Sequence, residues 1–279
     1  MITDKQREER KLGIGGSDMP IILGLSSYKT PYQLYLEKTG LEEPKQEESQ
    51  FQYWGNQLEE IVRNEFSKRN GFEIMLPDTQ IHPLFDFMRA NVDGYIQSEN
   101  AVLEVKCASS FMAYEWGEDG SDVIPMQYLV QVAHYCSVLN ASKAYIAVLI
   151  GGNDYREFLY ERDLELEGHI IEKAKEFWAC VQNKTPPEPI NQIDLKLMFP
   201  RHAEEKMVTV NGEIKEQLTE IINNRFQIKK LSDVEDKYKF NIMQFMKDAE
   251  CLIDEEGKPI VSWKANKNGS RVFRVKESA

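Results

Sequence analysis

The sequence predicts an α/β fold, with a mixed central sheet flanked by helices and followed by a helical arm and a β-hairpin. Long segments repeat apolar residues at helical spacing, and they fall at 51–70, 126–139 and 164–182. Shorter runs typical of strands lie at 72–76, 79–82, 88–96, 102–107, 144–150 and 157–161. The chain has 279 residues, 42% of them hydrophobic, which is enough for one large packed domain or a domain with an appendage.

The N-terminal region is predicted to lead into a short apolar helix. Residues 1–12 are charged and amphipathic, and the glycine-rich segment 13–16 is predicted to be a flexible loop. Ser17 and Asp18 then offer side-chain caps to a helix that continues through Leu23.

Proline and glycine residues indicate where the next predicted helices begin and end. Pro31 favours the start of a second helix over 32–39, and Gly71 is placed to end the long helix over 51–70. Further on, the turn residues 98–100 and 151–154 each separate two predicted strands.

The proline-rich segment 186–189 is the clearest boundary in the chain. We therefore predict a core over 1–189 and an appendage over 190–279. Within the appendage, 212–253 is predicted to be a long charged helical region. The paired runs 260–264 and 271–276 are predicted to form the terminal β-hairpin.

Composition excludes several classes of protein. No run approaches the roughly 18 apolar residues of a membrane helix, and the charged N-terminus lacks an apolar signal region, so a cytoplasmic protein is expected. The four cysteines are scattered and give no zinc or iron–sulfur spacing. A net charge of −12 is mild evidence against a nucleic-acid partner, although residues 256–279 carry six Lys or Arg against two Glu.

The most informative residues are Asp93, Glu104 and Lys106, which interrupt two otherwise apolar strand patterns. Side chains alternate along a strand, so Glu104 and Lys106 share one face while Leu103 and Val105 take the other. Burying such charges is unfavourable unless they bind something, and paired carboxylates suit a hard divalent cation such as Mg²⁺. A lone Glu-x-Lys on a strand is usually surface charge, so on these strands alone both interpretations stay open.

Two further groups have a functional and an ordinary interpretation. Glu59 lies at the edge of the apolar stripe of the 51–70 helix and is predicted to point toward the sheet, with Glu60 toward water. Gln131, on the 126–139 helix, is most simply a packing residue. Arg10 and Ser17 flank the glycine loop, whose backbone N–H groups suit a phosphate, although the loop fits neither a P-loop nor a Rossmann turn.

Taken in chain order, these segments resemble the YqaJ-type viral recombinase family, relatives of phage lambda exonuclease within the PD-(D/E)XK nucleases. The resemblance extends over about residues 8–185. The matching pieces are Arg10 to Asp18, Ile21 to Pro31, Gly55 to Glu59, Asn91 to Gly94, Leu103 to Lys106 and Tyr128 to Val132. It implies a restriction-endonuclease-like core. Val92 stands where the superfamily's name-giving proline would be, a common departure.

The resemblance implies an Mg²⁺-dependent 5′→3′ exonuclease acting on double-stranded DNA ends, with one or two ions and Mn²⁺ as a substitute. It also implies a trimeric ring and a partner that anneals single strands during phage-type recombination. The implied roles are metal binding for Asp93, Glu104 and the Val105 carbonyl, catalysis for Lys106, water positioning for Glu59 and Gln131, and 5′-phosphate binding for Arg10 and Ser17.

Two alternatives remain. One is a site-specific or structure-specific PD-(D/E)XK endonuclease, for which the helical arm would supply a reading element. The other is a non-catalytic protein that binds DNA ends, against which the intact Asp93, Glu104 and Lys106 argue.

Overall fold

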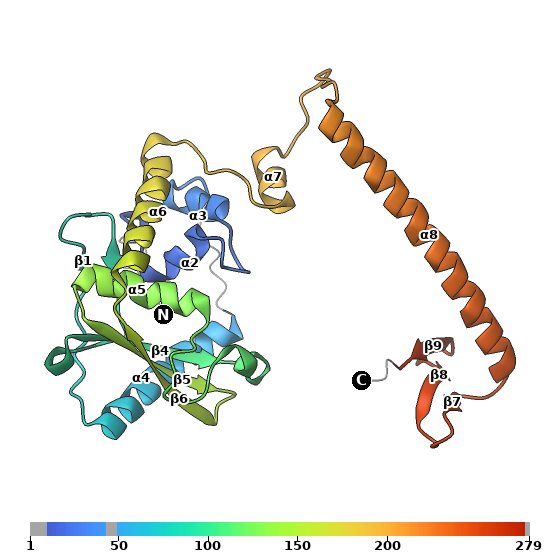
Figure 1. Ribbon diagram of the computed structural model, residues 1–279, viewed down its shortest axis with the longest axis horizontal. Coiled ribbons are helices and arrows are strands. Elements are labelled where there is room, and N and C mark those ends of the chain that lie inside the picture. The colour runs from blue at the N-terminus through green and yellow to red at the C-terminus, as the bar shows by residue number, and fades with distance from the viewer. Residues whose placement is uncertain (1–9, 43–48, 277–279) are drawn as a thin grey trace. The chain divides into compact units, whose positions relative to one another are not determined.

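The computed structural model describes residues 10–42 and 49–276, so most of the lead-in predicted over 1–12 lies outside the described residues. The chain divides into two compact units between Arg201 and His202 (Figure 1). The division falls beyond Pro189 because helix α7 (Gln192–Met198) is anchored to the first unit. Its Asp194 is fully buried and accepts a hydrogen bond of 2.6 Å from Thr30 Oγ1.

The first unit contains the predicted mixed sheet, in the order β3-β4-β5-β6. Its strands are β3 (Gly94–Ile96), β4 (Ala101–Ala108), β5 (Lys143–Ile150) and β6 (Asp154–Glu161). Strand β4 pairs antiparallel with β3 and parallel with β5, and β5 pairs antiparallel with β6. The parallel step is bridged by helix α5 (Met126–Leu139), as a parallel connection requires.

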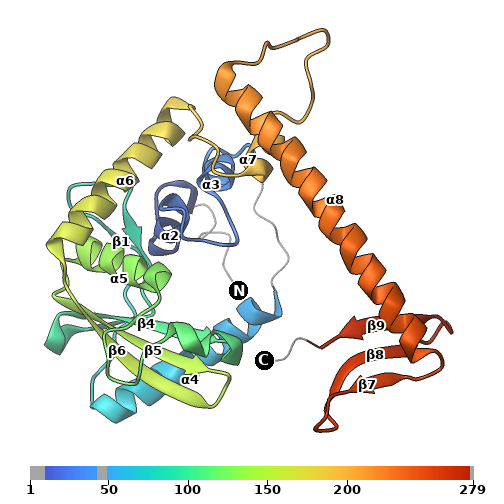
Figure 2. The same cartoon turned by 45° about the vertical axis from the view of Figure 1, so that its right-hand side comes forward.

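Helices cover both faces of this sheet (Figure 2). On one face, Val62 and Phe66 of α4 (Gln50–Asn70) pack with Leu103 and Val105. On the other, α5 and α6 (Leu164–Asn183) form the larger core, which includes Val102. The fold class is therefore the predicted one.

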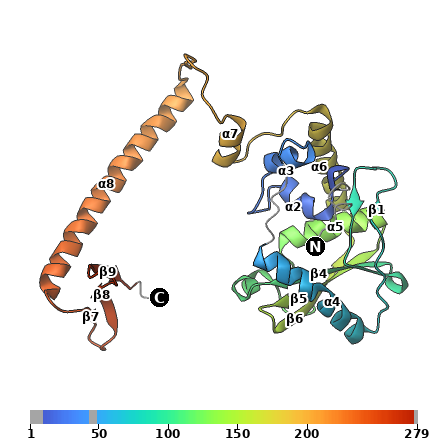
Figure 3. The same cartoon turned by 180° about the vertical axis from the view of Figure 1, so that it is seen from behind.

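Two short helices lie against α5 and α6, namely α2 (Met19–Ile22) and α3 (Pro31–Lys38) (Figure 3). Helix α3 begins at Pro31 as predicted, with Thr30 as its side-chain cap. The helix predicted after Ser17 and Asp18 is α2, which has Asp18 at its N-cap position and Leu23 at its C-cap position, and a 3₁₀ turn, η1 (Gly16–Asp18), precedes it. The Asp18 carboxylate folds back onto the backbone N–H of Gly15 instead of capping α2.

The strands before β4 are shorter than predicted. Ahead of β3, the strand β1 (Gln80–Ile81) pairs with β2 (Arg89–Ala90), and isolated bridges join Ile14 to Met88 and Met75 to Tyr95. The chain leaves extended pairing over 91–93, so Asp93 directly precedes β3. The turn before β4 is the 3₁₀ helix η2 (Gln97–Glu99), closed by Asn100 in the left-handed conformation at φ 47°, a conformation that asparagine tolerates. A further 3₁₀ helix, η3 (Ser110–Glu115), follows β4.

The second unit consists of one long helix and a small sheet. Helix α8 (Gly212–Met246) ends earlier than predicted, and residues predicted to continue it form strand β7 (Cys251–Ile253). The predicted hairpin is confirmed as β8 (Pro259–Ala265) and β9 (Arg271–Val275), and β7 adds a third strand in the order β7-β8-β9. In the part of the chain that the structure describes, no helix is long and apolar enough to cross a membrane.

Candidate active site

The antiparallel pair β3–β4 brings Asp93 and Glu104 together. Gly94 pairs with Leu103, so the preceding Asp93 reaches the next residues of β4. Its Oδ2 accepts a hydrogen bond of 2.8 Å from the backbone N–H of Val105. The predicted alternation is confirmed, because Leu103 and Val105 pack under α4 while Glu104 contacts α5 from the opposite face.

Glu104 is 2% exposed, and its two oxygens have different surroundings. Oε1 lies 2.5 Å from Lys106 Nζ and accepts a hydrogen bond of 2.6 Å from Gln131 Nε2. Oε2 is buried and has no hydrogen-bond partner among the described residues. A buried carboxylate oxygen without a donor is unfavourable, so a bound cation, or a proton shared with the adjacent Asp93, would stabilise it.

The charged groups of the site shift one another's pKa values. Burial and the neighbouring Glu104 carboxylate raise the pKa of Asp93 well above its ordinary value. Burial also raises the pKa of Glu104, although Lys106 opposes this. Burial disfavours the ammonium of Lys106, but the attraction of Glu104 and Asp93 outweighs it and raises the lysine pKa. Two carboxyl groups thus share one ammonium, and the repulsion that raises the pKa of Asp93 would be relieved by a divalent cation.

This donor set fits a divalent cation that keeps several waters. Among the described residues, no group of three or more His, Cys, Asp or Glu is arranged to hold a metal by itself. The set is instead two carboxylates, one with a buried unpartnered oxygen, beside the backbone of Val105. Mg²⁺ is bound in this way, through one or two carboxylates plus water and phosphate oxygens.

Glu59 reaches the site indirectly. Its Oε1 lies 2.9 Å from Arg63 Nη1, and the same nitrogen donates a hydrogen bond of 3.1 Å to the carbonyl of Asp93. The charge of Glu59 also raises the pKa of Asp93, after the larger effects of burial and Glu104. Glu60, one residue on, is exposed as predicted. Arg63 therefore ties Glu59 to the backbone that presents Asp93.

Gln131 connects Glu104 to a second site. Its Nε2 donates to Glu104 Oε1 and also, at 3.0 Å, to the hydroxyl of Tyr135, one helical turn away on α5. The ring of Tyr135 packs so closely on Gly16 that a Cβ on this glycine would lie 2.4 Å from it. Tyr135 is thus the common wall between the carboxylates and the glycine loop.

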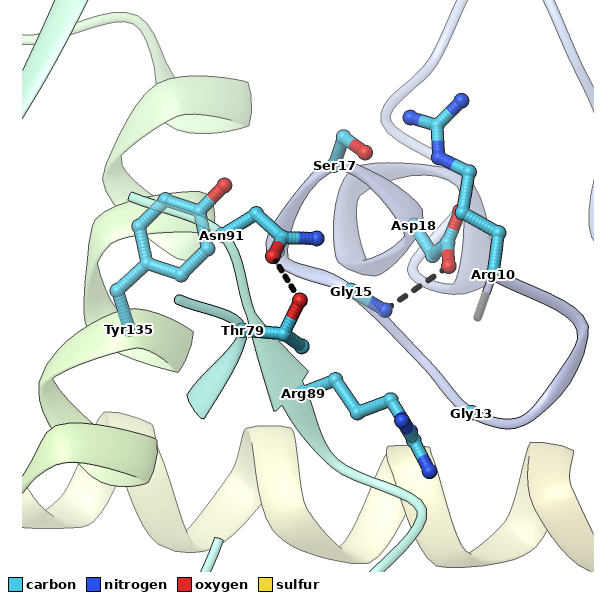
Figure 4. Close-up of a pocket in the computed structure, with 10 residues that line it drawn as sticks. Arg10, Gly13, Gly15, Ser17, Asp18, Thr79, Arg89, Asn91 and Tyr135 are labelled. Atoms are coloured by element: carbon cyan, nitrogen blue, oxygen red, sulfur yellow. Dashed lines mark hydrogen bonds between the residues drawn. The ribbon is translucent and has the colours of Figure 1, made fainter. Parts of the chain in front are cut away.

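The glycine loop lines a cavity of about 110 Å³ (Figure 4). The lining includes Arg10, Ser17, Arg89, Asn91 and Tyr135, and it brings together the two residues predicted to bind a 5′-phosphate. Arg10 and Ser17 are both exposed at this cavity.

One of the backbone N–H groups of the glycine loop is already occupied, because that of Gly15 donates to Asp18 Oδ2 at 2.9 Å. Lys38 Nζ neutralises that carboxylate at 2.7 Å and also donates to the carbonyls of Arg10 and Gly13. Although burial opposes it, this ion pair lowers the pKa of Asp18. Asp18 and Lys38 therefore hold the loop in shape, and the cations left facing the cavity are Arg10 and Arg89.

Sequence reasoning assigned no role to Tyr135, Arg63 or Arg89. Two of them carried a readable signal, since Tyr135 follows Gln131 and Arg63 follows Glu59 by one helical turn. Arg89 carried none, because its place beside the glycine loop depends on contacts between distant parts of the chain.

The Gly16→Ala variant tests the close packing of the loop on Tyr135. The added methyl group would lie 2.4 Å from the tyrosine ring, so we expect a loss of about 1–3 kcal/mol of stability, as for other overpacked sites. Gly15→Ala is the matched control, because its nearest neighbour would be Asp18 Oδ2 at 3.8 Å. Urea unfolding of both variants measures the difference, and equal stabilities would contradict the packing argument.

The fold and the buried site define a protein of the PD-(D/E)XK class, in which an aspartate, a glutamate and a lysine meet on a mixed sheet. The chain belongs to the YqaJ-like viral recombinase family. Residues 7–142 match the family described as YqaJ-like viral recombinase domain. Over 258 residues the chain is 36% identical to "Uncharacterized protein YqaJ" of Bacillus subtilis (strain 168), covering 90% of this chain and 80% of that protein.

Solved structures with this fold include an alkaline exonuclease, LHK-Exo, from Laribacter hongkongensis. It superposes with a TM-score of 0.54 at 15% identity, covering 66% of this chain and 94% of that one. A structure of LHK-Exo in complex with dAMP gives a TM-score of 0.55 at 15% identity, with coverages of 70% and 97%. At this level of identity the likeness establishes a shared fold.

Proposed function

We propose that this protein is a metal-dependent 5′→3′ exonuclease that resects double-stranded DNA ends for recombination by single-strand annealing. The observation that carries the proposal is the cluster of Asp93, Glu104 and Lys106, in which Glu104 is buried and one of its oxygens has no hydrogen-bond partner among the described residues. The shared fold with an alkaline exonuclease supports a nuclease, and the dAMP complex of that enzyme supports a DNA substrate.

Mg²⁺, or Mn²⁺ in its place, would be held by Asp93, Glu104 and the carbonyl of Val105. Such an ion, alone or as one of a pair, would polarise a phosphoryl oxygen and lower the pKa of an attacking water. Lys106 stays protonated beside Glu104 and is placed to stabilise negative charge that develops at phosphorus. Gln131 fixes the orientation of Glu104 through its hydrogen bond, and we assign it and Glu59 the positioning of water.

The cavity beside the glycine loop is proposed to bind the 5′-phosphate of the strand being degraded. Arg10 offers a planar guanidinium, and Ser17 a hydroxyl, to phosphate oxygens. Tyr135 separates this cavity from Gln131 and Glu104, so a phosphate held there lies next to the site of cleavage.

The Arg10→Ala variant tests this assignment. The wild-type enzyme is expected to degrade a 5′-phosphorylated end faster than a 5′-hydroxyl end, and the variant is expected to lose that preference because the dianion loses its guanidinium partner. The measurement is the ratio of the two rates for each protein. Lys68→Ala, which removes a cation from an exposed position on α4, is the control and keeps the preference. Equal rates in the wild type would leave the loop with a structural role only.

We further propose that the protein works as a homo-oligomer, a trimeric ring, and passes its single-stranded product to an annealing protein. A single heterologous interface closes into a ring when its rotation allows, and such a ring encloses DNA without a fixed register. Light scattering measures the assembly, and a monomer at micromolar concentration contradicts the ring.

Digestion of linear DNA labelled at either end, compared with covalently closed DNA, tests the proposed reaction. An exonuclease releases the 5′ label first from linear DNA, leaves closed DNA intact, and stops when a chelator removes Mg²⁺. Cleavage of closed DNA would instead establish the endonuclease alternative. Binding to ends without any cleavage would establish the non-catalytic alternative.

A further inference from the structure

The terminal hairpin of the second unit concentrates positive charge in a chain that is acidic overall. Between Lys258 and Lys276 there are six Lys or Arg and no Asp or Glu, whereas the whole chain carries a net charge of −12. These residues build strands β8 and β9 and the turn between them. The positive charge therefore belongs to the hairpin of β8 and β9, whereas the turn between β7 and β8 carries the acidic residues 254–256.

The register of the hairpin sorts these residues onto two faces. Trp263 pairs with Phe273 and Ala265 with Arg271, so these four side chains share one face. The opposite face carries Lys264 and Arg274, which pair with Val272 and Ser262, respectively. Lys276 extends the same face, because its backbone N–H bonds to the carbonyl of Ile260. We call Lys264, Arg274 and Lys276 the basic face.

Arg271 is built into the opposite face. Its guanidinium lies 3.6 Å from the centroid of the Trp263 ring and donates to the carbonyls of Trp263, Lys247 and Ala249. Two of these carbonyls follow the end of α8, so Arg271 fastens the sheet to that helix. Met246 and Val261 are buried in the same unit. The basic face is therefore presented by an ordered sheet.

The cations of the basic face have little to neutralise them. Lys264 lies 3.2 Å from Glu250, but both side chains are more than half exposed, and such pairs contribute little. Arg274 and Lys276 are exposed and make no ion pair within the described ranges. None of these cations lies directly opposite another, but all three project from one face, so their positive potentials add and favour a polyanionic ligand.

We propose that the basic face binds the phosphate backbone of double-stranded DNA as a second contact, separate from the active site; this inference rests on the proposed nuclease function. The aromatic rings of this sheet, Trp263 and Phe273, lie on the other face. The basic face thus lacks the stacking platform by which proteins hold single-stranded bases. Contacts to phosphates alone are independent of sequence and allow the protein to move along a duplex.

The double variant Arg274→Glu/Lys276→Glu of the full chain tests the inference. Binding is measured on covalently closed duplex DNA in the presence of a chelator, so neither ends nor cleavage contribute. We expect weaker binding, with the slope of log affinity against log salt reduced by about 1.8, at about 0.9 for each phosphate that the protein no longer neutralises. The control Lys229→Glu/Lys230→Glu makes the same change in charge at exposed positions of α8 and keeps both values.

Each other outcome overturns the inference. Unchanged affinity and salt slope in the double variant would assign the basic face to another partner, such as an acidic protein. An equal loss of affinity in the α8 control would show that binding depends on the net charge of the protein and not on the basic face. Stronger binding to single strands than to duplex, abolished in the double variant, would identify a single-strand site. The double variant should still cleave a short labelled duplex at saturating protein concentration, so failure of the basic face is distinguishable from failure of the nuclease assignment.

Discussion

The Asp93→Asn variant is expected to lose nuclease activity by at least about a thousandfold, because removing one metal ligand removes several kcal/mol of transition-state stabilisation at about 1.4 kcal/mol per tenfold. Glu104→Gln is expected to lose activity to a similar extent. Neither loss should come from unfolding. Both are measured on labelled linear duplex with saturating Mg²⁺, and full activity in either variant or in a chelator contradicts the assignment.

The same substitution at Asp93 should leave the fold intact and raise its stability. In the wild-type protein, burial and the Glu104 carboxylate both disfavour a charged Asp93 and raise its pKa. A neutral amide removes that repulsion, keeps an oxygen for the N–H of Val105, and offers an N–H to the neighbouring Glu104 carboxylate, whose Oε2 lacks a partner. We expect a gain of about 1 kcal/mol in the free energy of unfolding without metal.

Three controls test the prediction for Asp93→Asn. Asp93→Ala should be equally inactive but less stable than the amide variant, since the buried N–H of Val105 loses its acceptor. Added Mg²⁺ should stabilise the wild-type protein by mass action but neither Asp93 variant. Glu60→Gln, which changes an exposed carboxylate on α4, should alter neither activity nor stability. A destabilised Asp93→Asn protein would show that the two carboxylates do not repel each other in the fold.

The central part of the site follows from local patterns in the sequence. Alternation along 102–107 places Glu104 and Lys106 on one face, and the apolar neighbours Leu103 and Val105 require the opposite face of that strand to be covered. The edge position of Glu59 on its helix likewise follows from helical periodicity. These features depend on residues close in sequence, so one chain is enough to predict them.

Features that depend on distant contacts were not predictable in the same way. The Asp18 carboxylate would cap the following helix on local rules, but Lys38, twenty positions later in the chain, draws it back over the loop. Asp93 was placed within a strand, whereas its bond to the N–H of Val105 holds it just outside β3. In both cases a tertiary partner outweighs the local preference.

The start of helix α7, just after the proline-rich segment, has a local signal in the sequence. The proline-rich segment 186–189 suggests an end to the core, yet Asn191 caps the next helix by accepting from the N–H groups of Ile193 and Asp194. An asparagine before an apolar helical run is an ordinary helix start. The buried bond between Asp194 and Thr30 then joins that helix to the first unit, which no local pattern indicates.

The Lys106→Met variant is expected to lose turnover by at least about a hundredfold, because its ammonium acts where negative charge builds up in the transition state. DNA binding, measured in the presence of Ca²⁺ or a chelator, should fall much less. A loss of binding in proportion to rate would make Lys106 a phosphate anchor only. Lys106→Arg should not restore full activity, since a planar guanidinium does not replace a compact ammonium.

Lys106 is also the counter-ion of the buried Glu104 and of the half-buried Asp93, so its removal is expected to lower the stability of the fold as well. Lys106 Nζ lies 2.5 Å from Glu104 Oε1, and removing one partner of a buried ion pair costs about 3–5 kcal/mol. Without metal, Lys106→Met should therefore unfold at lower urea than the wild type. Adding Glu104→Gln to the same chain removes the uncompensated charge and should restore most of the stability but none of the activity. If the double variant is no more stable than Lys106→Met alone, the lysine stabilises the fold by packing on the Tyr128 ring, 5.1 Å from its Nζ, rather than through its charge.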